Sequence, residues 1–268
     1  IVTTDKRARL EEKPEVRKAG GVYYTPEYIV RYIVDSTVGT LIQGKTPAQI
    51  ENMRFADIAC GSGSFLLGVY DVLLRYHTKW FNDNPDKAKK AGCVLRDDGA
   101  WHLSLNQRRR ILLNNIYGVD IDHQAVEVAQ LSLYLKLLQE ETTASARQHQ
   151  LEFHETLLPS LHKNIVCGNS LIGSDILSGQ LFASEDERKL NPMDYEQRFP
   201  EIMKRGGFDA IVGNPPYVRQ ESLSNIKGYL ESHYQSFDGI ADLYAYFMEK
   251  SLSLLKPDHP RLPSLRQN

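Results

Sequence analysis

The stretch DIACGSGSF, residues 57–65, decides the expected fold class of this 268-residue chain. An apolar run over residues 54–59 predicts a buried strand, and apolar residues at helical spacing follow the stretch. Gly61 and Gly63 allow a tight turn between strand and helix and let a ligand approach the backbone. A diphosphate loop is disfavoured, because no Gly-Lys-Ser/Thr follows, the third glycine of the dinucleotide fingerprint is absent and Asp57 is acidic. The turn therefore favours a ligand with an ammonium or sulfonium group, or is an ordinary strand-to-helix turn.

Three further apolar runs predict strands over residues 116–120, 164–167 and 208–212, and helical segments separate them. Strands that alternate with helices indicate an α/β fold, with a mostly parallel sheet and helices on both faces. Ligands of such sheets bind beyond the carboxyl ends of the strands, where all four runs carry a motif. The helix after the second strand is predicted from the apolar residues Ala125, Val128, Leu131, Leu135 and Leu138.

The composition is that of an ordinary globular protein, with 41% hydrophobic and 25% charged residues. The formal net charge of −2 does not indicate nucleic-acid binding through bulk charge. The three cysteines, Cys60, Cys93 and Cys167, are widely spaced and indicate neither a disulfide framework nor a metal site. The charged N-terminus and the lack of a long apolar run predict a cytoplasmic protein that does not associate with membranes.

Polar residues stand at the ends of the expected strands and at the start of a helix. Asp120 is placed to accept hydrogen bonds from two ribose hydroxyls, whereas Asp122 competes for that role or caps the next helix. Asn169 can read an adenine edge, although Gly-Asn-Ser is more often a plain turn. Thr25 is predicted to cap a helix that has Pro26 in its first position.

The fourth strand is followed by GNPPY, residues 213–217, in which two prolines stiffen a loop. The side-chain oxygen of Asn214 and the carbonyl oxygen of Pro215 remain as acceptors, and together they can bind both hydrogens of one amino group. Such binding takes the nitrogen lone pair out of conjugation and aims it at an electrophile. Tyr217 can stack on a flat ring. The loop therefore predicts a site for the exocyclic amine of a planar base.

These motifs, in this order, resemble the N6-adenine DNA methyltransferases, above all the methylase part of type IIG restriction-modification enzymes with motifs in the gamma order. The likeness covers roughly residues 17–257 and rests on GVYYTPEYIV, DIACGSGSF, YGVDID, CGNSLIG and GGFDAIVGNPPYV, followed by the helix DLYAYFMEKSLSLLKP. The resemblance implies a Rossmann-like fold that binds S-adenosylmethionine and methylates the amine of a flipped adenine in DNA, as part of a restriction-modification system.

The resemblance also implies a role for each matching residue. The catalytic residues would be Asn214, Pro215, Pro216 and Tyr217, and Tyr217 and Phe247 would contact the target base. The cofactor would be bound by Tyr24, Thr25, Asp57, Ala59, Gly61, Gly63, Asp120, Ile121, Asn169, Ser170 and Asn214. In this set Thr25 would hold the methionine carboxylate, and Asn169 stands where the family often has Asp. Core packing explains Phe247 equally well.

The expected organisation is an N-terminal helical segment over residues 1–51, a methyltransferase core over 52–256 with a helical insertion near 80–110, and an irregular tail over 257–268. The C-terminal strands of the fold and a target-recognition domain are expected to be missing. The fourth strand should then have an uncovered edge, which predicts self-association or a separate specificity domain or subunit, in addition to DNA, as partners.

Other functions remain open at this point. Glutamine methyltransferases of the release-factor type also carry NPPY, and RNA adenine methylation uses the same chemistry. A non-catalytic truncated remnant or a cofactor-binding fragment would also keep these motifs. Cytosine-5 methylation is rejected, because none of the three cysteines follows a proline.

Overall fold

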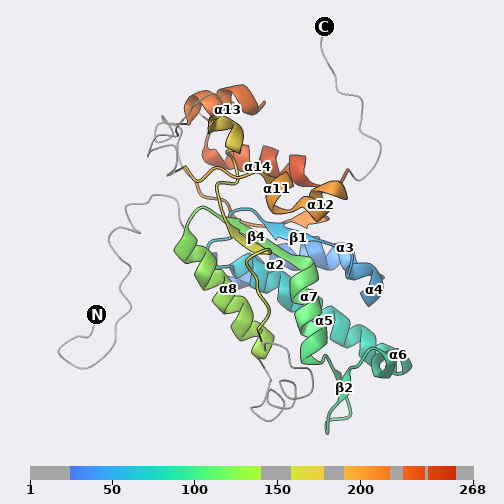
Figure 1. The fold of residues 1–268 in the computed structure, drawn as a ribbon. Coiled ribbons are helices and arrows are strands. Elements are labelled where there is room, and N and C mark those ends of the chain that lie inside the picture. The colour runs from blue at the N-terminus through green and yellow to red at the C-terminus, as the bar shows by residue number, and fades with distance from the viewer. Residues whose placement is uncertain (1–24, 140–157, 178–189, 218–225, 239–240, 258–268) are drawn as a thin grey trace, which may run out of the picture.

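The centre of the molecule is a parallel sheet with the strand order β5-β4-β1-β6 (Figure 1). The computed structural model describes residues 25–139, 158–177, 190–217, 226–238 and 241–257. The strands are β1 (Phe55–Asp57), β4 (Ile116–Asp120), β5 (Ile165–Cys167) and β6 (Ala210–Ile211). The predicted α/β fold with a mostly parallel sheet is confirmed.

The register of the strands brings the four motifs to one edge of the sheet. Asp57 lies opposite Gly118, and Asp120 lies opposite Cys167. Because the strands are parallel, the loops that follow them all leave from the carboxyl edge. The glycine turn, the two acidic strand ends and the GNPPY loop are therefore neighbours in space although the sequence separates them.

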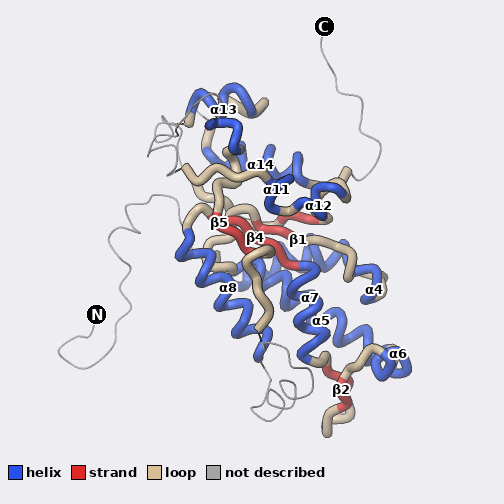
Figure 2. The backbone as a smooth tube through the Cα atoms, in the orientation of Figure 1, coloured by secondary structure: helices blue, strands red, loops and turns tan. Residues whose placement is uncertain are grey.

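Helices cover both faces of the sheet, as predicted (Figure 2). One face carries α2 (Glu27–Val34), α5 (Ser64–Asp83), α7 (Leu105–Asn115) and α8 (His123–Leu138). The other face carries α11 (Tyr195–Arg198), α12 (Pro200–Lys204) and α14 (Leu243–Leu254), with α13 (Lys227–His233) beyond them. Shorter helical segments are η1 (Asp35–Gly39), α3 (Thr40–Ile42), α4 (Pro47–Ile50), α6 (Pro85–Lys90) and η2 (Ser174–Leu177).

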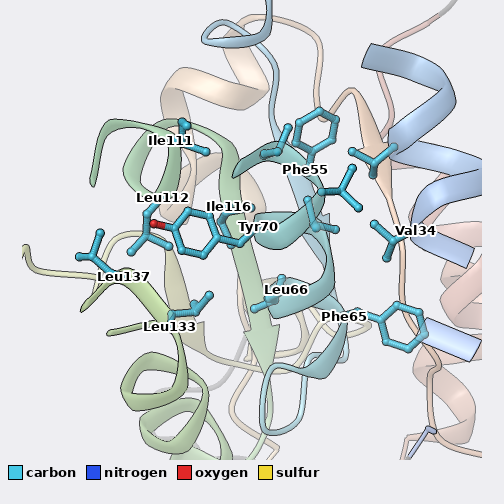
Figure 3. Packing of buried hydrophobic residues seen from close by; sticks show 14 of the residues in the cluster. Val34, Phe55, Phe65, Leu66, Tyr70, Ile111, Leu112, Ile116, Leu133 and Leu137 are labelled. Atoms are coloured by element: carbon cyan, nitrogen blue, oxygen red, sulfur yellow. The ribbon is translucent and has the colours of Figure 1, made fainter. Parts of the chain in front are cut away.

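Successive residues of a strand point into two different cores, because side chains alternate between the faces of a sheet. Phe55 and Ile116 belong to the core under α5 and α8, whereas Ala56 belongs to the core under α11, α12 and α14. Figure 3 shows the first of these cores, which contains Leu66 of α5, Leu133 of α8 and Ile116 of β4. Both faces of the sheet are thus buried, as a parallel sheet requires.

The apolar residues that predicted α8 are not the ones that it buries. Its buried residues are Val126, Ala129, Gln130, Leu133 and Leu137. Val128, Leu131 and Leu135, which the sequence offered as helical markers, are about half exposed or more. Leucine and valine occur on both sides of this helix, so periodicity alone does not identify the core face.

Three of the four strands are shorter than predicted, whereas β4 has the predicted bounds, and the edge strand β6 is only partly uncovered. The predicted strand 208–212 reduces to Ala210–Ile211 as β6. Before β6, the backbone N–H of Phe208 donates to the carbonyl of Leu254, and the N–H of Lys256 donates to the carbonyl of Phe208. The chain after α14 therefore pairs with the start of this strand, and the edge stays open only beside β6 in the described part of the chain.

The region expected as a helical insertion also contains a hairpin. Residues 80–110 include the end of α5, helix α6, the antiparallel strands β2 (Val94–Leu95) and β3 (Trp101–His102), and the start of α7. Within the described ranges, no helix is both long enough and apolar enough to cross a membrane.

Candidate active site

The loop after β1 is held open by its glycines. Gly61 has φ +50° and Gly63 has φ +89°, a backbone conformation that other residues adopt only with strain. A Cβ atom on Gly63 would lie 3.0 Å from the Cβ of Ala129 in α8, so a side chain there would also push the loop off the helix. The N–H of Ala59 donates to Asp57 Oδ1 at 3.0 Å. These features fix the path of the backbone around a concave turn.

Asp120 joins the loops after β1 and β4. Its Oδ2 accepts from the N–H of Gly61 at 2.7 Å, and its Oδ1 accepts from the N–H of Asp122 at 2.9 Å. Asp122 is the N-cap of α8, because its Oδ1 accepts from the N–H of Gln124 at 2.9 Å. The two acidic residues thus divide as the sequence suggested: Asp122 caps the helix, and Asp120 faces the glycine turn. A carboxylate has about four acceptor sites, and Gly61, Asp122 and Ile121 donate to Asp120, so it can still accept from a ligand.

Burial perturbs both strand-end carboxyls. Asp57 is 2% exposed, and burial raises its pKa to about 7, with opposition from the Ala59 N–H and a smaller upward contribution from Asp120. Burial also raises the pKa of Asp120, which hydrogen bonds from Asp122 and Gly61 partly offset. Among the described residues, no basic side chain is a cause of either pKa shift. These carboxyls therefore create a site of negative potential that a cation would stabilise.

The GNPPY loop lies directly against this acidic site. A Cβ atom on Gly213 would lie 2.5 Å from Asp57 Oδ1 and 3.0 Å from its Cγ. Only a glycine lets the backbone pass so close to a buried carboxyl. The next residue is Asn214. The GNPPY loop, which is predicted to bind an amine, therefore contacts Asp57, which is predicted to bind a cation.

Thr25 does not cap α2, which corrects the sequence prediction. Helix α2 begins at Glu27, and its N-cap is Pro26, which makes no side-chain cap bond. Instead, Asn214 Nδ2 donates to Thr25 Oγ1 at 3.2 Å. This bond sets the orientation of the amide: Nδ2 faces Thr25, and Oδ1 faces away from it and can accept from a ligand. Thr25 is thus a neighbour of the GNPPY loop.

The remaining predicted residues divide into exposed and buried groups. Pro215 and Pro216 are half-buried, whereas Tyr217 is 51% exposed. Phe247, predicted for the base pocket, is 8% exposed and packs in the core under α14. Core packing was the alternative that the sequence left open for Phe247. The exposed ring beside Tyr217 belongs to Tyr244, which the sequence analysis did not single out as a site residue.

Residues after β4 and β5 complete the edge of the site. Ile121 is 54% exposed and offers an apolar surface beside Asp120. Asn169 Oδ1 accepts from the N–H of Leu171 at 3.0 Å, so the residue forms a turn, and its amide oxygen keeps one lone pair. Ser170 is buried, and its hydroxyl donates to the Ile58 carbonyl at 2.5 Å. Ser170 thus connects the turn after β5 to the residue that follows β1. Tyr24, the other predicted cofactor residue, lies outside the described residues.

The sequence matches the Eco57I restriction-modification methylase family over residues 114–259, which is more than half of the chain. The chain belongs to this family. The matched residues include β4, β5, β6, the GNPPY loop and α14, so the family match contains three of the four strand ends that form the site.

Individual relatives of this family member are much longer than the chain itself. The type II restriction enzyme and methyltransferase RM.Eco57I of Escherichia coli is 34% identical over 247 residues, a match that covers 88% of the chain and 22% of that protein. The adenine-specific methyltransferase PglX of Streptomyces coelicolor is 26% identical, over 78% of the chain and 15% of that protein. Among solved structures, the type IIL restriction-modification enzyme MmeI in complex with DNA has a TM-score of 0.44 at 18% identity, over 85% of the chain and 26% of the MmeI chain.

Proposed function

We propose that this chain is the methylase part of a restriction-modification enzyme, and that it transfers a methyl group from S-adenosylmethionine to the exocyclic amine of adenine in DNA. One observation carries the proposal: Asp57, at the end of β1, lies against the backbone of Gly213. This contact supports the proposal, because a buried carboxyl suited to a cation then lies beside the residue that precedes Asn214, whose amide is suited to an amine. The names of the relatives, which include adenine-specific methyltransferases, agree with it.

The donors and acceptors at the strand ends fit S-adenosylmethionine. That cofactor carries an ammonium, a sulfonium and a ribose diol. Asp57 is buried and Asp120 is half-buried, and neither carboxyl has a basic partner among the described residues, so a cationic ligand would offset the cost of their desolvation. Lone pairs on Asp120 remain for the diol, and the exposed Ile121 can cover one face of an adenine ring. When bound, the cofactor supplies an electrophilic methyl group.

The protein residues would act on the acceptor chiefly by positioning it. Asn214 Oδ1 and the Pro215 carbonyl would accept the two N–H groups of the adenine amine and direct its lone pair. The bond from Asn214 Nδ2 to Thr25 Oγ1 would keep the amide oxygen free to accept from the amine. Tyr217 would stack on the base. No general base is required before transfer, because the methylated amine is cationic and loses its proton to water.

The direct experiment offers the chain three acceptors together with S-adenosylmethionine that carries a labelled methyl group. The acceptors are DNA oligonucleotides of mixed sequence, the matching RNA, and a peptide that contains glutamine. We expect N6-methyladenine in the digested DNA. Label only in RNA or only in the peptide would assign one of the alternative functions, and no label in any acceptor, with a folded chain, would identify a non-catalytic fragment.

The affinity for S-adenosylmethionine is expected to rise with pH through neutrality. Because burial raises the pKa of Asp57 to about 7, this carboxyl is mostly neutral at pH 6 and mostly ionised at pH 8. A cation binds the ionised form, so the dissociation constant should be about tenfold higher at pH 6 than at pH 8. Calorimetric titration across this range measures the effect.

The matched control for this pH dependence is Asp57→Asn, which is expected to bind weakly and equally at both pH values. The carboxyl of Asp120 and the thiol of Cys60 also face Asp57, but Asp57→Asn isolates its own contribution. An affinity of the unsubstituted chain that does not change between pH 6 and pH 8 would remove Asp57 from the cofactor site.

A further inference from the structure

The ring of Tyr217 has an aromatic partner on a different element. Tyr244, near the start of α14, lies parallel to it, with an interplanar angle of 4° and ring centroids 5.5 Å apart. The two rings are exposed to 51% and 37%, respectively. Stacked tyrosines that remain this exposed form an aromatic surface at the tip of the GNPPY loop.

The spacing of the two rings decides where a flat ligand can bind. A base inserted between them would need a contact of about 3.5–4.0 Å on each side, or roughly 7–8 Å between the ring planes. The separation of the planes cannot exceed the 5.5 Å between the centroids. A base therefore cannot occupy the space between the rings. A ligand that stacks on Tyr217 would have to use the face opposite Tyr244.

Tyr244 is also fixed more firmly than Tyr217. Helix α14 is anchored by Tyr246, which is fully buried, and by the Glu249 carboxylate, which accepts from the N–H groups of Gln235 and Ser236 at 2.9 and 2.8 Å. The GNPPY loop, in contrast, has no helix or strand of its own, and its Asn214 side chain bonds to Thr25. The ring on the helix can therefore hold the ring on the loop.

We propose that Tyr244 is a positioning residue that fixes the ring plane of Tyr217 and leaves it one face for the target base. This inference rests on the proposed function, in which Tyr217 stacks on a flipped adenine. An adenine guided to one face of Tyr217 has its amine at a constant height relative to Asn214 and Pro215. Tyr244 would thereby improve the alignment of the amine without touching the base.

The test compares Tyr244→Ala, Tyr244→Phe and Leu252→Ala in the full chain. Leu252 is 69% exposed on the same helix and serves as the matched control. Binding of an oligothymidylate that carries one 2-aminopurine is followed by quenching of its fluorescence, and methyl transfer to an adenine oligonucleotide is measured in parallel. Because Tyr244→Ala removes one stacked aromatic contact, we expect kcat/KM to fall by about threefold to tenfold.

The expected pattern is specific to positioning by a ring. Tyr244→Ala should weaken 2-aminopurine quenching and methyl transfer while it leaves the affinity for S-adenosylmethionine unchanged, and Tyr244→Phe and Leu252→Ala should behave like the unsubstituted chain. Unchanged kcat/KM in Tyr244→Ala, or an equal loss in Tyr244→Phe, would overturn the role of Tyr244 alone. Absence of methyl transfer in the unsubstituted chain would overturn the proposed function, and this inference with it.

Discussion

Replacement of Asn214 by alanine is expected to lower methyl transfer to adenine by about 10²–10³-fold, a loss typical of removing one preorganised hydrogen-bonding group from an active site. The side-chain oxygen of Asn214 is one of the two acceptors proposed for the amine, and its Nδ2 is the group that bonds to Thr25. Alanine removes both interactions. Single-turnover transfer to a DNA oligonucleotide measures the loss.

Cofactor affinity separates this effect from damage to the fold. Asn214→Ala is expected to change the dissociation constant for S-adenosylmethionine by less than about threefold, because Asp57 and Asp120 supply the principal charges of the proposed cofactor site. Asn214→Asp keeps an acceptor oxygen but adds a negative charge beside Asp57, so its activity should lie between those of Asn214 and alanine. Asn52→Ala, at an exposed asparagine of the turn after α4, is the control. Normal turnover in Asn214→Ala would refute the mechanism.

Gly207→Ala is expected to destabilise the protein by about 4 kcal/mol, the sum of backbone strain and steric overlap in a packed region. Gly207 has φ +121°, and a Cβ atom there would lie 2.1 Å from the carbonyl oxygen of Leu254. That carbonyl cannot easily move, because it accepts from the N–H of Phe208 at 2.9 Å. Urea unfolding followed by circular dichroism measures the change in the free energy of unfolding.

The adjacent glycine provides a matched control for this prediction. Gly206 also has a positive φ, +96°, but the nearest atom to its added Cβ is Pro257 Cδ at an ordinary 3.6 Å. Gly206→Ala should therefore show the backbone strain alone, about 1–2 kcal/mol. Equal losses of stability in the two variants would mean that overlap with the Leu254 carbonyl adds no cost beyond backbone strain.

The sequence predicts which residues meet at the strand ends, because the relevant signals are local. Glycines with positive φ, acidic strand ends and a double proline each act within a few residues, and parallel strands bring their carboxyl ends to one edge. Asp57, Gly61 and Asp120 therefore meet where the spacing of the motifs places them.

What the sequence does not predict depends on contacts between distant segments. Thr25 looks like a helix cap, but it bonds to Asn214 instead, a partner 189 residues away. Tyr244 and Phe247 lie on one amphipathic helix, and only the packing of α14 shows that the first ring is exposed beside Tyr217 and the second is buried. Helix α8 is apolar on both sides, so its buried face follows from the sheet beneath it.

The most direct test of the central claim is a calorimetric titration of the chain with S-adenosylmethionine, alongside Asp120→Ala and the control Asp83→Ala. Asp120 holds the glycine turn and is proposed to take the ribose hydroxyls, whereas Asp83 is exposed at the end of α5. We predict a dissociation constant around micromolar, roughly −8 kcal/mol, that Asp120→Ala weakens by at least about tenfold and Asp83→Ala does not change. A folded chain that binds no S-adenosylmethionine, or binds it equally well without Asp120, would contradict the proposed site.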